Sequence, residues 1–500
     1  MTPTPGLSRR SLFRRAAALG GALGMFSGTD TRAEARARPR NVVFMVADGM
    51  STGIPSLAEP FSRQVRGRGT EWAALARDPL TASGWCDTAS LGSLVTDSSA
   101  ASSAWATGSR VLNGSVNVLP DGRRLTPIGI LARQSGRRLG LVTTTTVTHA
   151  TPACFVAVHP SRDQEEAIAP QYLDVADVLL GGGARFFDGA LRADGKNVRA
   201  AFAAAGYRVL DSRASLLTAG TAGRLLGLFG PGHLPYEIDR RPGVDSDTMP
   251  TLAEMTRAAL GALDGAPGGY LLQVEGGRVD HAAHANDAAG ALREMLAFDD
   301  ALGVVLDYAR RTGDTLVVVT SDHGNSNPGL NGIGAEYAGS TAGLQMLAGF
   351  RASSGVVLQK LRDGRDSQQR VPGAFASDVV REYCGIALTA DDAGTLAAAA
   401  GGPLPAEINR QHANASGLLA QVLGNYTGIG WTGMSHTADL TMVMATGPGR
   451  ERFAGLQLNT DTFAALTALM DIAFVNPAMS GQDAGRVAGR RPEAPAPHWL

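Results

Sequence analysis

The sequence predicts an α/β fold in which helices cover both faces of a mostly parallel central sheet. From residue 41 onward, short apolar runs alternate with alanine-rich stretches of helical character, the pattern of repeated strand–helix–strand units. The apolar runs lack polar alternation, as expected of strands that are buried on both faces. The chain has 500 residues, 44% of them hydrophobic, and can therefore bury a large core.

The expected elements follow from these segments in order. Buried strands are expected at residues 42–46, 139–145, 177–180, 270–274 and 315–320. Helices are expected at residues 98–106, 198–205, 252–263 and 288–309. The apolar run at residues 91–95 is expected to be a strand that leads to Asp97 and Ser98, and another apolar run spans residues 440–444. Polar residues directly follow several of these runs, and ligands of such sheets bind beyond the carboxyl ends of the strands.

Residues 1–37 are interpreted as a twin-arginine signal peptide. Arg9 and Arg10 precede a weakly apolar stretch at residues 16–26, and small residues from Ala33 to Ala37 offer cleavage sites. This interpretation implies the twin-arginine export machinery as a partner and a periplasmic or secreted protein; the alternative is a basic tail. Residues 38–500 are expected to form a single α/β domain, with an insertion at about residues 325–431 beside the mouth of the site.

The composition excludes several classes of function. The 45 basic and 46 acidic residues balance, which leaves no electrostatic signal for nucleic-acid binding. No run of 18 apolar residues occurs, so no membrane span is predicted. With only three cysteines, a cysteine-based metal site is excluded, and any bound metal needs histidine and carboxylate ligands.

Histidine and aspartate gather at a few positions in a chain with only nine histidines. Asp280 and His284 are one helical turn apart, with His281 between them. Asp322 and His323 are adjacent at the end of a predicted strand. Carboxylates together with histidines are the ligand set of zinc once cysteine is excluded.

Five of the other histidines divide into two kinds. His436 precedes the apolar run at residues 440–444 and resembles a ligand in its position. Four others are interpreted as structural or surface residues: His159, His233, His412 and His498.

A second pattern runs from Asp97 to Gly108 and contains mostly serine and alanine, with Ser98 at the start of a predicted helix. Unpaired N–H groups and the helix dipole favour negative charge there. A serine acts as a nucleophile only when its hydroxyl is activated, and no histidine is its neighbour in sequence, so a metal ion is the expected activator. The alternative is an ordinary cap of the helix.

These motifs resemble those of the alkaline phosphatase family. The Asp97–Gly108 pattern resembles the nucleophile motif, and residues 41–50 resemble the strand that carries a metal-bridging aspartate, here Asp48. The remaining motifs follow in the family's order: Thr148-His149-Ala-Thr151, Gln273-Val-Glu275-Gly, Asp280-His-x-x-His284, Ser321-Asp-His323 and Ser435-His436-Thr437. The resemblance covers most of residues 41–324 and about 431–447, and it implies the fold of that family.

The resemblance implies three metal ions. One zinc would be held by Asp280, His284 and His436. A second zinc would be held by Asp48, Asp322 and His323, together with Ser98. A third ion, magnesium in preference to zinc, would be held by Asp48, Thr151 and Glu275, with His149 as a further contact.

The resemblance also implies the reaction, which is hydrolysis of phosphate monoesters of broad range to an alcohol and inorganic phosphate. Ser98 would form a phosphoserine intermediate. Arg162 would grip two phosphate oxygens, Asp97 would orient Arg162, and His281 would lie near the phosphate. The resemblance is also compatible with a homodimer.

Two other functions remain open at this point. A phosphodiesterase, or a phosphatase dedicated to one metabolite, would share the metal ligands and differ in its contacts to the phosphate oxygens. Arg162 favours the monoesterase. A phosphate- or metal-binding protein without catalysis is the alternative from another class, and the complete ligand set beside Ser98 argues against it.

Overall fold

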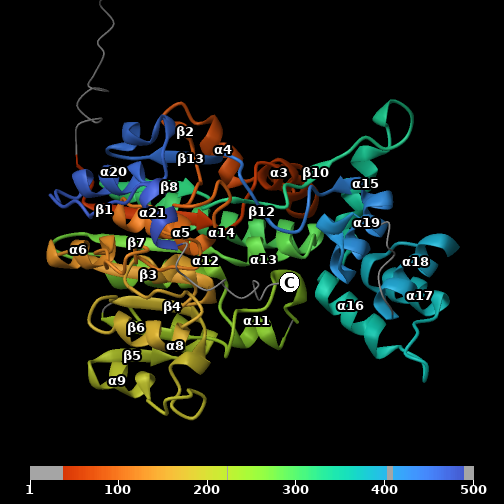
Figure 1. The fold of residues 1–500 in the computed structure, drawn as a ribbon, viewed down its shortest axis with the longest axis horizontal. Coiled ribbons are helices and arrows are strands. Elements are labelled where there is room, and N and C mark those ends of the chain that lie inside the picture. Colours follow the sequence, from red (N-terminus) through yellow and green to blue (C-terminus); the bar gives the residue numbers. More distant parts are fainter. Residues whose placement is uncertain (1–37, 222, 242, 402–408, 489–500) are drawn as a thin grey trace, which may run out of the picture. The chain divides into compact units, whose positions relative to one another are not determined.

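The computed structural model describes residues 38–488, apart from residues 222, 242 and 402–408. They belong to one compact unit with a ten-stranded sheet at its centre (Figure 1). Across the sheet the order is β14 (Gly455–Gln457), β2 (Ala82–Cys86), β13 (Thr441–Thr446), β8 (Thr315–Thr320), β1 (Asn41–Ala47), β7 (Tyr270–Gly276), β3 (Arg138–Thr146), β4 (Val178–Gly182), β6 (Arg224–Leu228) and β5 (Tyr207–Leu210).

The sheet is mostly parallel, as the sequence predicts. Every neighbouring pair is parallel except the two that involve β13, which is antiparallel to both β2 and β8. The five buried strands expected from the sequence are confirmed as β1, β3, β4, β7 and β8. The α/β fold class is therefore confirmed.

Helices cover both faces of the sheet (Figure 1). One face carries α3 (Gly53–Arg66), α12 (Leu252–Leu263) and α14 (Ala288–Thr312). The other carries α5 (Ser98–Thr107), α6 (Ile128–Gln134), α9 (Val198–Ala204) and α20 (Asp461–Leu469). The remaining α-helices described outside residues 325–431 are α4 (Glu71–Arg77), α7 (Ala150–Ala153), α8 (Glu165–Ile168), α10 (Arg213–Leu217), α11 (Asp245–Thr248), α13 (Arg278–His284) and α21 (Gly481–Ala488). All four predicted helices are present at the expected positions.

The side chains of the central strands alternate between two hydrophobic cores. In β1, Val43 and Met45 belong to the core shared with α12 and α14. Val42 and Phe44 belong to the core on the opposite face, where the ring of Phe44 lies 5.1 Å from that of Trp105 in α5. Because both faces are buried, both sets of side chains are apolar, and the strand shows no alternation in sequence.

The prediction of a strand at residues 91–95 is wrong. The strand in this region is β2, which ends at Cys86, and residues 91–97 form a loop with no helix or strand. Gly92 and Ser93 interrupt the apolar run; Leu91 is buried in a small hydrophobic cluster, but Leu94 is 77% exposed, so the run as a whole is not a buried strand. A loop, not a strand, therefore delivers Asp97 and Ser98.

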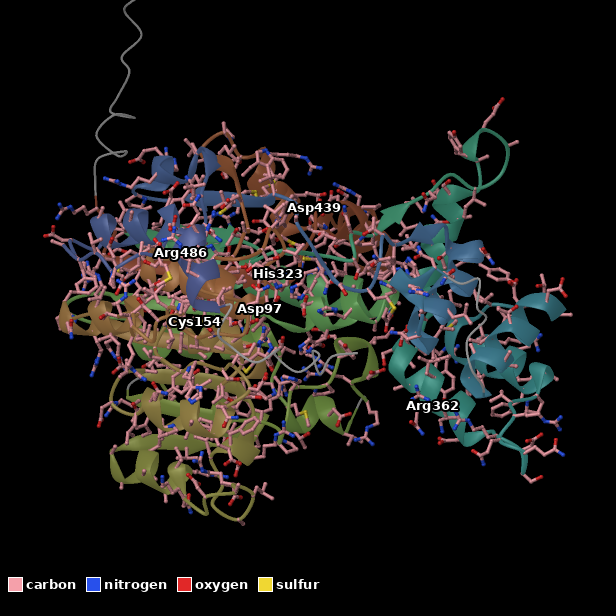
Figure 2. All side chains as sticks on the ribbon, viewed as in Figure 1. Asp97, Cys154, His323, Arg362, Asp439 and Arg486 are labelled. Carbon is pink, nitrogen blue, oxygen red and sulfur yellow. The ribbon has the colours of Figure 1, made fainter. Side chains whose placement is uncertain are left out.

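The segment at residues 325–431 is largely helical. Its helices are α15 (Ser340–Met346), α16 (Ser354–Asp363), α17 (Gly373–Cys384), α18 (Ala390–Gly401) and α19 (Ala415–Thr427). The short strands β10 (Gly329–Leu330) and β11 (Ile429–Gly430) pair antiparallel and join its two ends. In Figure 2, Arg362 marks α16, and His323 marks the segment that follows β8; the two labels are well separated in this view.

Two predictions concern residues outside this description. The signal peptide at residues 1–37 and His498 both lie outside the described residues. Among the helices that are described, none has both the length and the apolar character needed to cross a membrane.

Candidate active site

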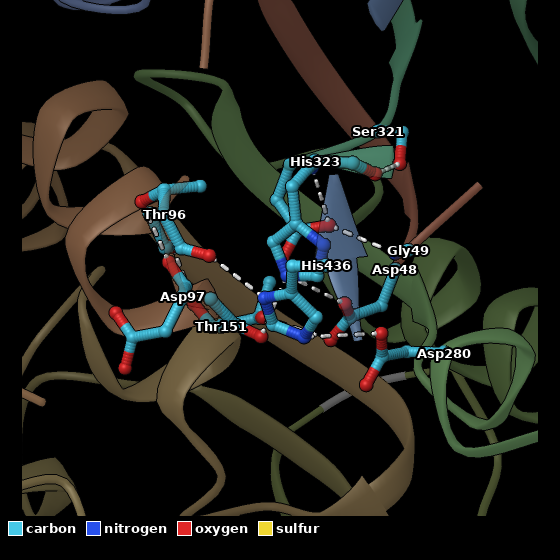
Figure 3. Close-up of polar contacts among 12 residues, drawn as sticks. Asp48, Gly49, Thr96, Asp97, Thr151, Asp280, Ser321, His323 and His436 are labelled. Carbon is cyan, nitrogen blue, oxygen red and sulfur yellow. Dashed lines mark hydrogen bonds and ion pairs between the residues drawn. The ribbon is translucent and has the colours of Figure 1, made fainter. Parts of the chain in front are cut away.

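The candidate site lies beyond the carboxyl ends of three neighbouring parallel strands. Asp48 follows β1 directly, Glu275 is the penultimate residue of β7, and Asp322 and His323 come shortly after β8. Because β7, β1 and β8 are adjacent, their side chains meet at one end of the sheet. In Figure 3, Asp48 and His323 lie beside Asp280, which comes from α13.

A glycine lets two of these carboxylates approach the end of β1. Gly49 has φ +64°, and a Cβ atom at this position would lie only 2.4 Å from Oδ1 of Asp280. The N–H group of Gly49 donates to Oδ1 of Asp322 at 3.0 Å. A residue with a side chain would be strained in this conformation and would also displace Asp280.

The first ligand group contains Asp280, His284 and His436. The Nε2 atoms of the two histidines are 3.0 Å apart, and they lie 3.4 and 3.5 Å from the carboxylate oxygens of Asp280. Each ring donates from Nδ1 to a backbone carbonyl, His284 to Met434 at 2.8 Å and His436 to Thr96 at 2.7 Å (Figure 3). In a neutral ring this leaves Nε2 without a proton, so two lone pairs and a carboxylate face one point, as they do around a divalent cation.

The second group surrounds Ser98. His323 Nε2 lies 3.2 Å from Ser98 Oγ, 3.2 Å from Asp322 Oδ2 and 3.5 Å from Asp48 Oδ1. All four residues are buried. Ligand atoms of Asp48, Asp280 and His323 lie within 4.8 Å of one another, so this group adjoins the first.

The third group contains Asp48, His149 and Glu275, whose ligand atoms also lie within 4.8 Å of one another. Thr151 Oγ1 lies 3.5 Å from Asp48 Oδ2. Threonine hydroxyls of β3 donate to Oε2 of Glu275, so its other oxygen, Oε1, is available to a ligand. The carboxylate and hydroxyl oxygens of this group are hard donors, and the imidazole nitrogen of His149 is a softer one.

The donor atoms themselves indicate that these groups bind cations. Among the described residues, several buried ligand atoms have no hydrogen-bond partner: Asp48 Oδ1, His149 Nδ1, Glu275 Oε1 and Asp322 Oδ2. Buried polar atoms seldom remain unpaired in folded proteins. Carboxylate oxygens and imidazole nitrogens are ligands of divalent metals, so the residues present fit metal ions.

The charges of the site lead to the same conclusion. Four buried carboxyl groups share it: Asp48, Glu275, Asp280 and Asp322. Burial, with the charge of Asp322, raises the pKa of Asp48 well above its ordinary value, and burial raises the pKa of Glu275 to about 7. Burial opposes ionisation of Asp280 and Asp322 too, but the adjacent histidines hold the pKa of each below its ordinary value. Bound cations would favour the ionised form of all four carboxyl groups.

Ser98 and Arg162 are linked through Asp97. Ser98 is the first residue of α5, and Asp97 caps this helix by accepting the N–H of Ala100 at 2.9 Å. The other carboxylate oxygen of Asp97 accepts from Arg162 Nη1 at 3.1 Å. Arg162 Nη2 donates to Nε2 of His149 at 2.9 Å, so the guanidinium is fixed between two partners.

His281 is placed near the site but is not a member of any ligand group found among the described residues. Its Nδ1 accepts from Arg278 at 2.7 Å, and its ring centroid lies 5.7 Å from that of His149. It lines a cavity of about 410 Å³ together with His149, Ala150, Arg162, Asp163, Glu165, His233, Tyr236 and His284.

Some contributors to the site were not predicted from the sequence. His233, interpreted above as an ordinary histidine, lines the cavity, and its ring centroid lies 4.7 Å from that of His281. Asn325 donates to Oδ1 of Asp280 at 2.6 Å. The sequence gives no signal for either residue, since His233 lies in a loop and Asn325 in the two-residue strand β9 (Gly324–Asn325). By contrast, His159 and His412 bond to Ser161 and Asn286 respectively.

Comparisons with known proteins agree with this geometry. The family model described as alkaline phosphatase matches residues 39–472. Alkaline phosphatase 4 of Bacillus subtilis is 30% identical over 465 residues, which cover 88% of this chain and 92% of that protein. Streptomycin-6-phosphate phosphatase of Streptomyces griseus is 38% identical over 63% of this chain and 81% of that protein.

A solved structure of an alkaline phosphatase has a fold similar to that of this chain. The crystal structure of Thermus thermophilus alkaline phosphatase superposes with a TM-score of 0.83 and 36% identity, covering 93% of this chain and 98% of that one. The family match extends over most of the chain and includes every ligand group described above. The chain belongs to the alkaline phosphatase family and is a phosphatase.

Proposed function

We propose that the protein hydrolyses phosphate monoesters of broad range to an alcohol and inorganic phosphate through a phosphoserine intermediate. The observation that carries this proposal is the position of Ser98 Oγ, 3.2 Å from Nε2 of His323 and beside two adjoining ligand groups. The net reaction is ROPO3²⁻ + H2O → ROH + HPO4²⁻. Ser98 Oγ forms its bond to phosphorus as the bond to the alcohol oxygen breaks, and water then releases phosphate and restores the hydroxyl.

The proposal includes two zinc ions and one magnesium ion, with zinc as the alternative for the third. The first zinc would be held by Asp280, His284 and His436, and the second by Asp48, Asp322, His323 and Ser98. The third ion would be held by Asp48, Thr151 and Glu275, with His149 as a further contact. When bound, such ions lower the pKa of hydroxyl groups and of water and stabilise negative charge on oxygen.

The chain's own residues would bind and orient the phosphate. Arg162 carries a planar guanidinium that can bind two phosphate oxygens, and its bonds to Asp97 and His149 restrict its rotation. Its pKa is raised: burial works against this, but the charge of Asp97 outweighs it, so the guanidinium stays charged. His281 would lie near the phosphate, in the cavity wall next to His149.

The proposal places the protein in the periplasm or outside the cell, after export by the twin-arginine machinery. Arg9 and Arg10 of the sequence support this. A homodimer is compatible with the family, and small phosphate monoesters are the proposed partners of the site.

The decisive comparison is between a phosphate monoester and a diester. The holoenzyme should have a kcat/KM for p-nitrophenyl phosphate that exceeds that for bis(p-nitrophenyl) phosphate by at least about tenfold. A monoester has three non-bridging oxygens, which leaves two for Arg162 when one faces the cations, whereas a diester has only two in all. EDTA should abolish turnover, and zinc with magnesium should restore it. A preference for the diester would contradict the proposal.

Ser98→Ala should lower kcat by about a thousandfold or more, because the nucleophile is removed. Ser56→Ala is the matched control, since Ser56 is an exposed serine of α3 whose hydroxyl bonds only to the carbonyl of Thr52. Unchanged turnover in the Ser98 variant would rule out a serine mechanism.

A further inference from the structure

One wall of the active-site cavity carries hydrogen-bond donors that the proposed reaction does not use. The cavity of about 410 Å³ is bounded by Arg162 and His284 and continues along His281 to His233 and Tyr236. A phosphate bound at Arg162 would therefore leave this wall to the rest of the substrate. Its chemistry decides which leaving groups fit.

Two imidazole N–H groups on this wall have no hydrogen-bond partner among the described residues. His233 accepts the N–H of Thr146 at Nδ1, at 3.0 Å, so its proton lies on Nε2. His281 accepts from Arg278 at Nδ1, and since a guanidinium only donates, the proton of this ring also lies on Nε2. Neither Nε2 atom makes a hydrogen bond to a described residue. The two rings are close, with centroids 4.7 Å apart.

The positively charged guanidinium of Arg278 lies next to this pair of histidines. Arg278 lies with its guanidinium carbon 3.8 Å from the ring centroid of Tyr236 and donates to His281. Within the described part of the chain, Arg278 forms no ion pair with a carboxylate, and its Nε is buried without a partner. No direct ion pair therefore neutralises its charge, which makes the adjacent wall attractive to anions.

Neither of the two acidic residues that line the cavity, Glu165 and Asp163, forms an ion pair with Arg278. Glu165 is already engaged, because its Oε2 accepts from the hydroxyls of Thr146 and Thr148, each at 2.6 Å. Asp163 is exposed to solvent, where its charge is screened.

We propose that His233 and His281, with Arg278 as the positioning residue behind them, form a second anion subsite that binds an anionic group of the leaving alcohol. The subsite would accept a second phosphate or a carboxylate a few bonds away from the phosphate ester. The inference rests on the proposed function and adds to it a preference among phosphate monoesters. Bisphosphates and phosphorylated acids are favoured over esters of cationic alcohols.

The test is a series of butyl phosphates that share one alcohol chain and differ only at its far end. The probes are 1,4-butanediol bisphosphate, 4-hydroxybutyl phosphate and 4-aminobutyl phosphate, assayed with the metal-loaded enzyme at low ionic strength. After correction for its two equivalent ends, the bisphosphate should have a kcat/KM about tenfold above the hydroxy compound, the size of one hydrogen bond to a charged group. The amino compound should be the poorest substrate, and added salt should reduce these differences.

Variants of the wall separate charge from packing. Arg278→Gln should remove most of the preference for the bisphosphate, and Arg278→Lys should keep part of it. His233→Asn places an acceptor where Nδ1 bonds to Thr146 but removes the Nε2 donor, so it should also lower the preference. The matched control is Arg293→Gln, because Arg293 also lies over an aromatic ring, that of Phe61, and also has an unpartnered Nε, but lines a different cavity.

Binding provides a readout that does not depend on turnover. Calorimetric titration of the metal-loaded Ser98→Ala variant should show tighter binding of the bisphosphate than of 4-hydroxybutyl phosphate, and Arg278→Gln in that background should remove the difference. Equal affinities, or a preference that survives both Arg278→Gln and His233→Asn, would overturn the subsite. If none of the probes is hydrolysed by the wild-type enzyme, the proposed function fails, and the binding difference still decides whether the subsite exists.

Discussion

Two of the proposed metal ligands are oriented by backbone carbonyls that lie far from them in sequence. His284 and His436 face each other through Nε2 because the carbonyls of Met434 and Thr96 hold the proton of each ring on Nδ1. Burial, followed by the charge of His323, lowers the pKa of His436 to about 3, so this ring stays neutral over the working range of pH. A neutral imidazole with a free Nε2 is the form that binds a metal.

Glu294 is a buried carboxyl group outside the ligand groups, and it gives the fold a predictable pH dependence. It is 2% exposed on α14 and accepts the N–H of Glu237 at 2.6 Å. Burial, with a contribution from the charge of Glu237, raises its pKa from an ordinary 4.5 to about 8. The folded state therefore holds a proton that the unfolded chain releases between these two pH values, and stability falls as pH rises through this range.

Glu294→Gln should remove that loss of stability. The unfolding free energies of variant and wild type should be similar near pH 4, and the variant should be more stable by roughly 2–4 kcal/mol at pH 9. Chemical denaturation at several pH values, with the same metal load, measures this difference. Glu382→Gln, at an exposed glutamate of α17, is the control and should show no such trend. A variant that is less stable than wild type at pH 9 would contradict the account.

Individual residues were predictable where chemistry and motif agreed. Asp280, His284, Asp322 and His323 stood out because histidine is rare in this chain and because each pair has a ligand-like spacing. His233 did not stand out, since its role depends on a loop after β6 that reaches the ring of His281. No local pattern encodes a contact of that kind.

At the level of elements, the turn after β1 is the most sensitive link between fold and site. Gly49→Ala should lower kcat/KM by about 10- to 100-fold and reduce metal content, because the added Cβ would displace Asp280. Gly67→Ala is a matched control: Gly67 has a similar φ of +70°, but its Cβ would have no neighbour within 4 Å.

The two glycine variants separate strain from collision. Gly67→Ala should cost about 1 kcal/mol of unfolding free energy and leave activity unchanged, which isolates the cost of the left-handed backbone. Activity and metal content, measured on both variants, show whether the effect of Gly49→Ala comes from backbone strain or from the contact with Asp280. If Gly49→Ala retained full metal content and activity, Asp280 would not depend on the approach that this glycine permits.

Among the elements, buried parallel strands were the most predictable. Their runs of apolar residues reflect burial on both faces, as the two cores on either side of β1 show. The run at residues 91–95 has a similar composition but lies in an exposed loop, because pairing depends on neighbours that the run itself does not reveal. The two-residue strand β12 (His436–Thr437), which pairs with β9 (Gly324–Asn325), is too short to carry a sequence signal.

Over the whole molecule, the order of the strands explains why distant segments form one site. Neighbours in the sheet come from far apart in the chain, since β1 lies between β7 and β8. Their carboxyl ends meet, and α13 and β12 complete the ligand groups. The helical segment at residues 325–431 provides none of the residues that line the cavity among those described, so its effect on access stays a prediction.

Anomalous X-ray scattering at the zinc edge, from crystals of zinc-loaded protein, tests the central claim most directly. The account predicts two strong peaks, one among Asp280, His284 and His436 and the other among Asp48, Asp322 and His323, beside Ser98 Oγ. Peaks elsewhere on the molecule, or no peak in either group at full zinc load, would contradict it.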